Sequence, residues 1–142
     1  MIRREIDYQE AEKSYNEAWN TVSEVNEAGD LEKAIGTLKS MVTHAIRKVL
    51  RDRGIDYGLH DSYHYELYPI EEDVGKIEEG LCPITRLSDY KETLRRETKI
   101  KKTTNEIETR ERILRRNIPS VKAKILALLQ RIANENPLPS AL

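Results

Sequence analysis

Two histidines four residues apart are the first candidates for chemistry, because their imidazoles could bind a metal ion. His60 and His64 lie in a stretch rich in tyrosine, and on a helical turn both imidazoles would lie on one face, as a two-histidine metal clamp requires. Asp61, Glu66 or Cys82 could complete the coordination of the metal. This spacing is common, however, and a stable site needs three or four ligands in a fixed geometry. We therefore interpret both as structural histidines that hydrogen-bond within a loop, and predict neither a metal nor another cofactor.

A run of basic residues in the C-terminal half is the second candidate for chemistry. Of the 26 residues from 91 to 116, ten are basic and five are acidic. Cationic side chains along one helix can contact the phosphates of a nucleic acid. Pairs four residues apart, such as Glu106 and Arg110, would neutralise part of this charge, so a merely solvated helix face is the alternative interpretation. The predicted nucleic-acid contacts are Arg95, Arg96, Lys99, Lys101, Lys102, Arg110, Arg112, Arg115 and Arg116.

The amino-acid composition indicates which class of protein contains these residues. The chain has 142 residues, of which 38% are hydrophobic and 35% charged, and this balance suits long solvated helices better than a compact α/β enzyme. A single cysteine excludes an internal disulfide and fits a reducing compartment. The N-terminus lacks the apolar run of a signal peptide, and no stretch approaches the ~18 to 20 apolar residues of a membrane span. We expect a cytoplasmic protein without a membrane partner.

The formal net charge of −1 conceals a strong charge split. Residues 1–80 hold 18 acidic against 10 basic residues, a balance of −8, whereas residues 81–142 hold 7 against 14, a balance of +7. A basic surface of this kind can meet nucleic acid or an acidic surface, including that of another copy of the chain. Alternatively, acidic and basic helices pair with one another within a single bundle.

The spacing of apolar residues predicts an all-α bundle of four to five helices. Asp7 and Asp30 occupy the place of helix caps, and apolar residues at steps of three and four follow each of them, up to Gly29 and Gly54 respectively. These two helices form a helical hairpin. The next segment, residues 54–87, contains four glycines and two prolines. We interpret it as a structured loop with one short helix near residues 70–79.

One long charged helix is predicted over residues 88–117, with Ser88 as its cap and Asn117-Ile118-Pro119 as its break. A last helix follows, up to residue 134. The prediction is therefore a single helical domain over residues 1–134 and a flexible C-terminal tail over residues 135–142.

The second predicted helix resembles the second helix of HEPN domains. A Gly-Asp turn is followed by an apolar helix with Ala34 and Ala45, the basic Arg47, two large apolar residues and then Gly54-Ile55. The first helix is similar to the first helix of that family, so the likeness covers residues 7–66. Members of the family are helical bundles that often dimerise, and many are ribonucleases with an Arg-x4–6-His motif.

The resemblance also implies which residues would form an active site. Arg53 and His60 match the letters of the motif, and in a metal-independent ribonuclease His60 would act as general acid and base while Arg53 would stabilise charge on the phosphate. The family's motif belongs to a later helix, however, and there Arg115-Arg116-Asn117 is followed by no histidine. A non-catalytic member of the family is therefore predicted.

These observations predict a non-enzymatic binding or assembly module. It forms a homo-oligomer such as a homodimer, and contacts RNA, DNA or an acidic protein surface through residues 91–116. This helix has few apolar residues, but Ile100 and Ile107 lie one heptad apart and suit a contact between subunits. Two alternatives remain open. One is the ribonuclease of Arg53 and His60, and the other is a viral or mobile-element structural or inhibitor protein whose charge split serves polymer assembly or occupancy of a nucleic-acid channel.

Overall fold

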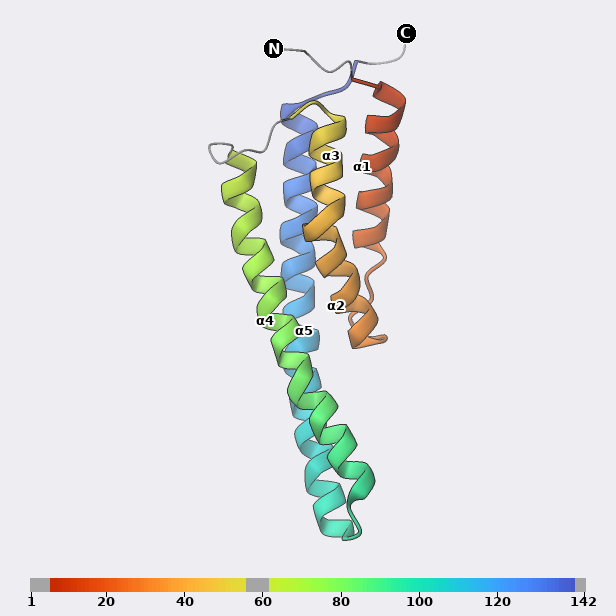
Figure 1. The fold of residues 1–142 in the computed structure, drawn as a ribbon, viewed down its shortest axis with the longest axis vertical. Helices are drawn as coiled ribbons and strands as arrows, with labels where there is room; N and C mark the ends of the chain where they lie inside the picture. Colours follow the sequence, from red (N-terminus) through yellow and green to blue (C-terminus); the bar gives the residue numbers. More distant parts are fainter. Residues whose placement is uncertain (1–5, 56–61, 140–142) are drawn as a thin grey trace.

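The computed structural model describes residues 6–55 and 62–139, and within these ranges the chain contains helices and no strands, which confirms the all-α prediction. Four helical rods lie side by side: α1 (Tyr8–Ser23), a second rod made of α2, η1 and α3, then α4 and α5 (Figure 1). The last two are much longer than the others. They continue past the end of the bundle as a two-helix hairpin (Figure 1).

The first two rods begin where the sequence predicts. The Asp7 carboxylate accepts hydrogen bonds from the backbone N–H groups of Gln9 and Glu10, at 3.1 and 3.2 Å. Asp30 accepts one from the N–H of Lys33, at 3.2 Å, at the start of α2 (Leu31–Ser40). These bonds satisfy donors that the first turn of a helix leaves free, so the predicted caps are confirmed.

The second rod contains a π-helical turn. α2 continues through η1 (Met41–Ala45) into α3 (Ile46–Asp52), and the N–H of Ile46 bonds to the carbonyl of Met41, five residues earlier. Met41, Val42 and Ile46 are all buried, so the apolar face stays on the core through the wider turn. The rod stops at Gly54 as predicted, and the φ of 72° there is a left-handed conformation that glycine adopts without strain.

The predicted loop over residues 54–87 is wrong for most of its length. α4 (Ser62–Thr93) is one helix of 32 residues that contains Pro69 and Pro83. Pro69 is exposed and Pro83 is half-buried, and each removes one N–H donor from the hydrogen bonds of the helix. The inner side of α4 follows a seven-residue repeat. Its members are Tyr63, Leu67, Ile70, Val74, Ile77, Leu81 and Ile84. Burial of this stripe outweighs the ~3 kcal/mol cost of an interior proline.

The predicted bounds of the long charged helix are also wrong. Ser88 lies inside α4, and the chain turns at residues 94–96 before α5 (Glu97–Glu135) begins. Pro119 does not break the chain, because it lies within α5 on an exposed position. Residues 88–117 therefore belong to both limbs of a hairpin, and the predicted last helix is the second half of α5.

α5 carries the same heptad spacing on its inner side. The buried members are Leu114, Ile118, Val121, Ile125, Leu128 and Ile132, and the partly buried Ile107 lies one heptad before Leu114. Two antiparallel helices with this repeat pack as a coiled coil, and α4 and α5 make the most extensive contact in the fold. Ile107 packs against this core within one chain, so it does not support the subunit contact that its spacing suggested.

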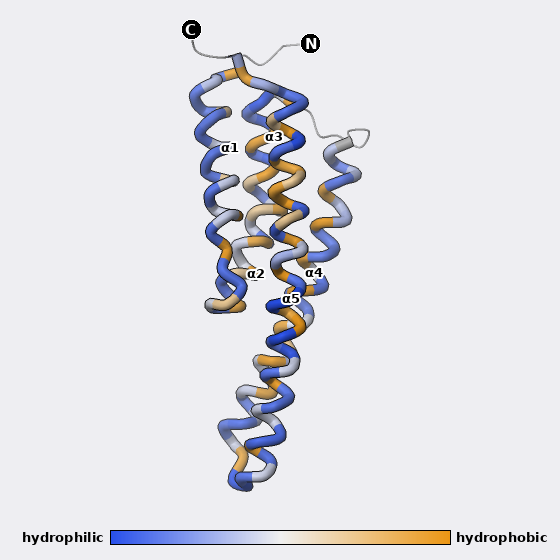
Figure 2. The backbone as a smooth tube through the Cα atoms, turned by 180° about the vertical axis from the view of Figure 1, so that it is seen from behind, coloured by the Kyte–Doolittle hydropathy of each residue, from blue (hydrophilic) through white to orange (hydrophobic). Residues whose placement is uncertain are grey.

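The contacts of α4 and α5 with the first two rods stop at about the same height along both long helices. Lys39 of α2 pairs with Glu78 of α4 at 2.9 Å, and Arg115 and Lys122 of α5 donate to backbone carbonyls of the loop between α1 and α2. Beyond these contacts, α4 runs on to Thr93, which at 1.5 Å per residue is about 22 Å. Hydrophobic and hydrophilic segments alternate along this projecting hairpin, residues 79–114 (Figure 2).

Some basic residues of the second half of the chain pair with acidic residues of the first half inside the bundle. Lys124 of α5 pairs with Asp73 of α4 at 2.7 Å, and Arg131 of α5 pairs with Glu66 of α4. These contacts join the basic half of the chain to its acidic half, as the interpretation of pairing within one bundle expects. They involve the part of α5 that lies beside the other rods.

Replacement by alanine should have opposite effects on the free energy of unfolding at two glycines of α4. A Cβ added at Gly75 would meet nothing within 4 Å, whereas one added at Gly80 would lie 2.7 Å from Cδ2 of Leu114. Gly75→Ala should therefore raise the free energy of unfolding by roughly 0.5–1 kcal/mol through helix propensity. Gly80→Ala should lower it by about 1 kcal/mol, because moving the buried leucine costs more than propensity gains. Urea denaturation of both variants measures this, and equal stabilisation would contradict the close approach at Gly80.

Candidate nucleic-acid interface

The tip of the projecting hairpin, residues 86–102, contains much of the predicted interface. It comprises the end of α4, the turn at residues 94–96 and the start of α5. Seven basic residues face three acidic ones here, a balance of +4. The basic residues are Arg86, Lys91, Arg95, Arg96, Lys99, Lys101 and Lys102. All are exposed except Lys91, which is half-buried.

None of these seven cations forms an ion pair with a residue that the structure describes. In the bundle, by contrast, Lys39, Lys48 and Lys124 each lie within 3.1 Å of a carboxylate oxygen. The three acidic residues of the tip, Asp89, Glu92 and Glu97, are likewise without an ion-pair partner in the described part of the chain. The tip is therefore a positive surface whose charges no fixed neighbour neutralises.

Local structure explains how the turn presents its arginines. The Thr93 hydroxyl donates to the carbonyl of Tyr90 at 2.8 Å, and the N–H of Leu94 donates to the carbonyl of Lys91 at 3.2 Å, which closes the last turn of α4. Arg96 stands at the cap position of α5 without a side-chain capping bond. The free N–H groups and the dipole of α5 therefore add partial positive charge at the same end.

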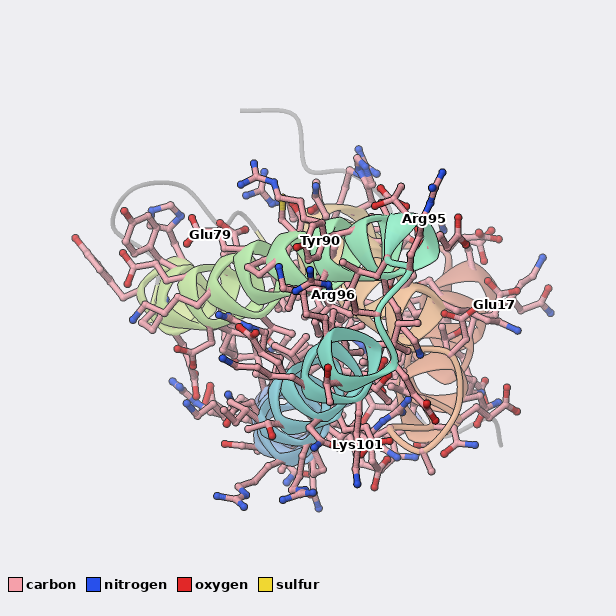
Figure 3. All side chains as sticks on the ribbon, turned by 90° about the horizontal axis from the view of Figure 1, so that it is seen from below. Glu17, Glu79, Tyr90, Arg95, Arg96 and Lys101 are labelled. Carbon is pink, nitrogen blue, oxygen red and sulfur yellow. The ribbon has the colours of Figure 1, made fainter. Side chains whose placement is uncertain are left out.

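The cations surround the tip and do not form one flat face. Viewed end-on, Arg95 and Arg96 lie toward α4, whereas Lys101 lies on the far side of α5 (Figure 3). A partner that touches all three must wrap around the tip or approach it along its axis. This arrangement differs from the single row along one helix that the sequence suggested.

The other predicted contacts lie farther along α5 and have different surroundings. Arg110 pairs with Glu106 at 3.3 Å, as its spacing predicts. Arg115 is half-buried and donates to the carbonyls of Glu27 and Gly29, the latter at 2.8 Å, so it fastens the loop between α1 and α2. The remaining two, at positions 112 and 116, are exposed. The structure thus groups five of the nine predicted residues at the tip and separates the other four from it.

Sequence reasoning missed Arg86 as a member of this surface, because residues 54–87 were interpreted as mostly loop, whereas Lys91 was counted in the basic 91–116 segment without being named as a contact. The signal that could have found Arg86 is the heptad repeat from Tyr63 to Ile84. That repeat predicts a helix that continues toward Arg86 and carries it to the same end as Arg95.

Arg53 has a structural environment in this fold. Its side chain is 9% exposed, and Nη1 donates to the backbone carbonyl of Asn136 at 2.6 Å. The guanidinium lies over the ring of Tyr15, 5.0 Å from its centroid. Burial lowers the pKa of Arg53, which stays protonated nonetheless, and burial also raises the pKa of Tyr15. His60, the predicted catalytic partner of Arg53, lies outside the described residues.

A polar network next to Arg53 holds the first residues of the predicted tail. The Tyr63 hydroxyl donates to the Glu135 carboxylate at 2.6 Å and accepts from Nδ2 of Asn136 at 2.9 Å. The hydrogen bond from Tyr63 is the main cause that lowers the pKa of Glu135, and burial raises the pKa of Tyr63. The predicted tail of residues 135–142 therefore starts with two residues that bond to α4.

The residues proposed as metal ligands do not gather in the described structure. Cys82 lies 18 residues after His64 on the same helix, which is about 27 Å along its axis. Glu66 pairs with Arg131, and His60 and Asp61 lie outside the described residues. Within residues 6–55 and 62–139, no three His, Cys, Asp or Glu side chains are placed to hold a metal ion together.

A groove of about 520 Å³ runs between α1 and the second rod. Its walls carry small and hydroxyl-bearing residues, among them Ser14, Ala18 and Gly36. The Ser14 hydroxyl donates to the carbonyl of Ala11 in its own helix, at 3.2 Å. Glu17, Lys33 and Lys48 also line the groove, and Lys48 is already paired with Glu10 and Asp52. The unpaired cations of the tip indicate a class of ligand more directly, so the tip remains the candidate interface.

Comparison with known proteins identified no relative of this chain. No family model matches the chain, and searches of curated proteins and of solved structures also returned no significant match. The resemblance to HEPN domains therefore stays a prediction. In the part of the chain that the structure describes, none of the helices combines the length and apolar character needed to cross a membrane.

Proposed function

We propose that this chain is a non-catalytic helical module that binds nucleic acid through the basic tip of its hairpin. The observation that supports the proposal is the set of seven cations at residues 86–102, none of them paired with a described carboxylate. Phosphates along a nucleic acid hold condensed counterions, and cationic side chains that replace these ions gain affinity from their release. Unpaired arginines and lysines can make such contacts without first giving up an ion pair.

The shape of the molecule supports the same proposal. The hairpin places the tip beyond the end of the bundle, with Arg86 about 12 Å and Thr93 about 22 Å along α4 from Glu78, and the bundle contains most of residues 1–80, whose balance is −8. The Debye length at physiological salt is about 8 Å. A polyanion at the tip is therefore screened from most of the repulsion that the acidic bundle would exert.

An acidic protein surface is the other partner class that this tip suits, and a second copy of the chain offers one. Residues 6–32 hold eight acidic residues against one basic residue. A contact between that region and the tip of another copy would join two different surfaces and would produce open chains unless it closed into a ring. We favour nucleic acid because the cations surround the tip, which suits a flexible strand better than a folded surface.

The ribonuclease alternative has less support. It needs the Arg53 guanidinium to face a phosphate, whereas this group is buried, bonded to the Asn136 carbonyl and stacked on Tyr15. Catalysis would require Arg53 to leave both contacts.

A salt series tests the proposal. Labelled RNA and duplex DNA of about 20 nucleotides should bind tightly at low salt, with a log–log slope of about −3 to −5 if four to six phosphates are neutralised. The same samples on a denaturing gel should show intact nucleic acid. Absence of binding at about 50 mM salt would contradict the proposal, and cleavage lost in His60→Ala would favour the ribonuclease. Equally tight binding of poly-glutamate, or concentration-dependent filaments at low salt, would favour an acidic protein partner or a structural assembly protein.

A further inference from the structure

One exposed aromatic residue lies among the cations of the tip. Tyr90 is 49% exposed on the last turns of α4. No described guanidinium covers its ring, and its hydroxyl makes no hydrogen bond to the described residues. The exposed Tyr8, Tyr65 and Tyr68 lie in the acidic half of the chain. Among the exposed tyrosines that the structure describes, Tyr90 is therefore the one whose neighbourhood attracts phosphates.

The cations nearest to Tyr90 come from both sides of it along the chain. Arg86 lies four residues earlier on α4, so it shares the helix face of Tyr90. Arg96 follows in the turn, and the end-on view shows Tyr90 and Arg96 on the same side of the tip (Figure 3). Asp89 and Glu92 are the acidic residues closest in sequence, but neither has the spacing of three or four residues that would place it on that face.

We infer that the tip binds single-stranded nucleic acid, with the Tyr90 ring as a platform on which one base stacks while Arg86, Arg96 and the cations of α5 contact the phosphates. Aromatic rings between cationic side chains are the usual means by which proteins hold single strands without reading their sequence. This inference rests on the proposed function and adds the class of nucleic acid to it.

The width of the tip argues against a duplex as the preferred ligand. Two packed helices, each about 10 Å across with axes 8–10 Å apart, span about 20 Å. The major groove of B-DNA is about 12 Å wide and admits one helix. A duplex can therefore reach the tip only through its outer phosphates, and its stacked bases would leave Tyr90 unused. A single strand can turn its phosphates toward the surrounding cations and one base toward the ring.

The experiment compares oligo-uridylate of about 20 nucleotides with a duplex of similar length, for wild type, Tyr90→Ala, Tyr90→Phe and the control Tyr65→Ala. Tyr90→Ala should weaken single-strand binding by about 5- to 150-fold, which is the range for one stacked base, without changing the salt slope. Tyr90→Phe, which keeps the ring, and Tyr65→Ala should bind as wild type, and the duplex affinity should not respond to any of the three. Circular dichroism at the assay temperature checks that each variant is folded.

The outcomes separate the inference from the function on which it rests. Salt-dependent binding that Tyr90→Ala leaves unchanged, or lowers equally for duplex and single strand, would overturn the stacking role and leave the basic tip as a phosphate contact. A duplex bound more tightly than the single strand would overturn the preference. No binding of either nucleic acid would overturn the inference together with the proposed function.

Discussion

Replacing Arg95, Arg96, Lys101 and Lys102 together with glutamine should lower the affinity for nucleic acid by roughly 10²- to 10³-fold at about 50 mM salt. Each phosphate contact contributes about 0.7 to 0.9 to the salt slope, so the slope should also become shallower by about 3. All four side chains are exposed and lack an ion-pair partner among the described residues. The free energy of unfolding should therefore stay within about 0.5 kcal/mol of wild type.

A second quadruple variant provides the matched control. Lys13, Lys33, Arg51 and Lys76 are also exposed, have no ion-pair partner in the described ranges, and lie outside the tip. Their replacement by glutamine removes the same net charge. It should weaken binding only slightly and leave the salt slope unchanged. Equal losses in the two variants would show that binding follows the net charge of the protein rather than the position of the tip cations.

Leu128→Ala should lower the free energy of unfolding by about 2–5 kcal/mol. Leu128 is fully buried in the apolar stripe of α5 that belongs to the core, and its truncation loses apolar burial and leaves a cavity that neighbouring side chains fill only in part. A domain of this size is stable by about 5–15 kcal/mol, so the loss is a large fraction of the total. Urea denaturation at constant temperature measures it.

Ile113→Ala on the same helix is the control for that substitution. Ile113 is 51% exposed, and alanine is the stronger helix former, so the change should stay within about 0.5 kcal/mol. Comparable destabilisation by the two variants would contradict the assignment of the inner face of α5. Leu128→Ala should still bind nucleic acid at temperatures where it is folded, because the tip is remote from the substitution.

The two halves of the chain differed in how well the sequence predicted them. Residues 7–54 follow local rules: Asp7 and Asp30 cap their helices, and Gly54 ends the second rod. The segment after residue 61 does not, because glycines and prolines that usually mark loops lie inside α4, with Pro69 and Gly75 exposed and Gly80 facing Leu114 of α5. A helix that buries a long apolar stripe tolerates them, and the heptad repeat was the stronger signal.

The sequence alone determined the helical class, the helix starts at Asp7 and Asp30, and the concentration of basic residues in the second half. These features depend on hydrogen bonds and apolar spacing within a few turns of one helix. Only the tertiary structure decided which cations stay exposed, that the chain reverses at residues 94–96, and that Arg53 and Arg115 fasten distant backbone carbonyls. Each of these depends on a partner more than 80 residues away or on the packing of α4 against α5, and local spacing carries no information about such contacts.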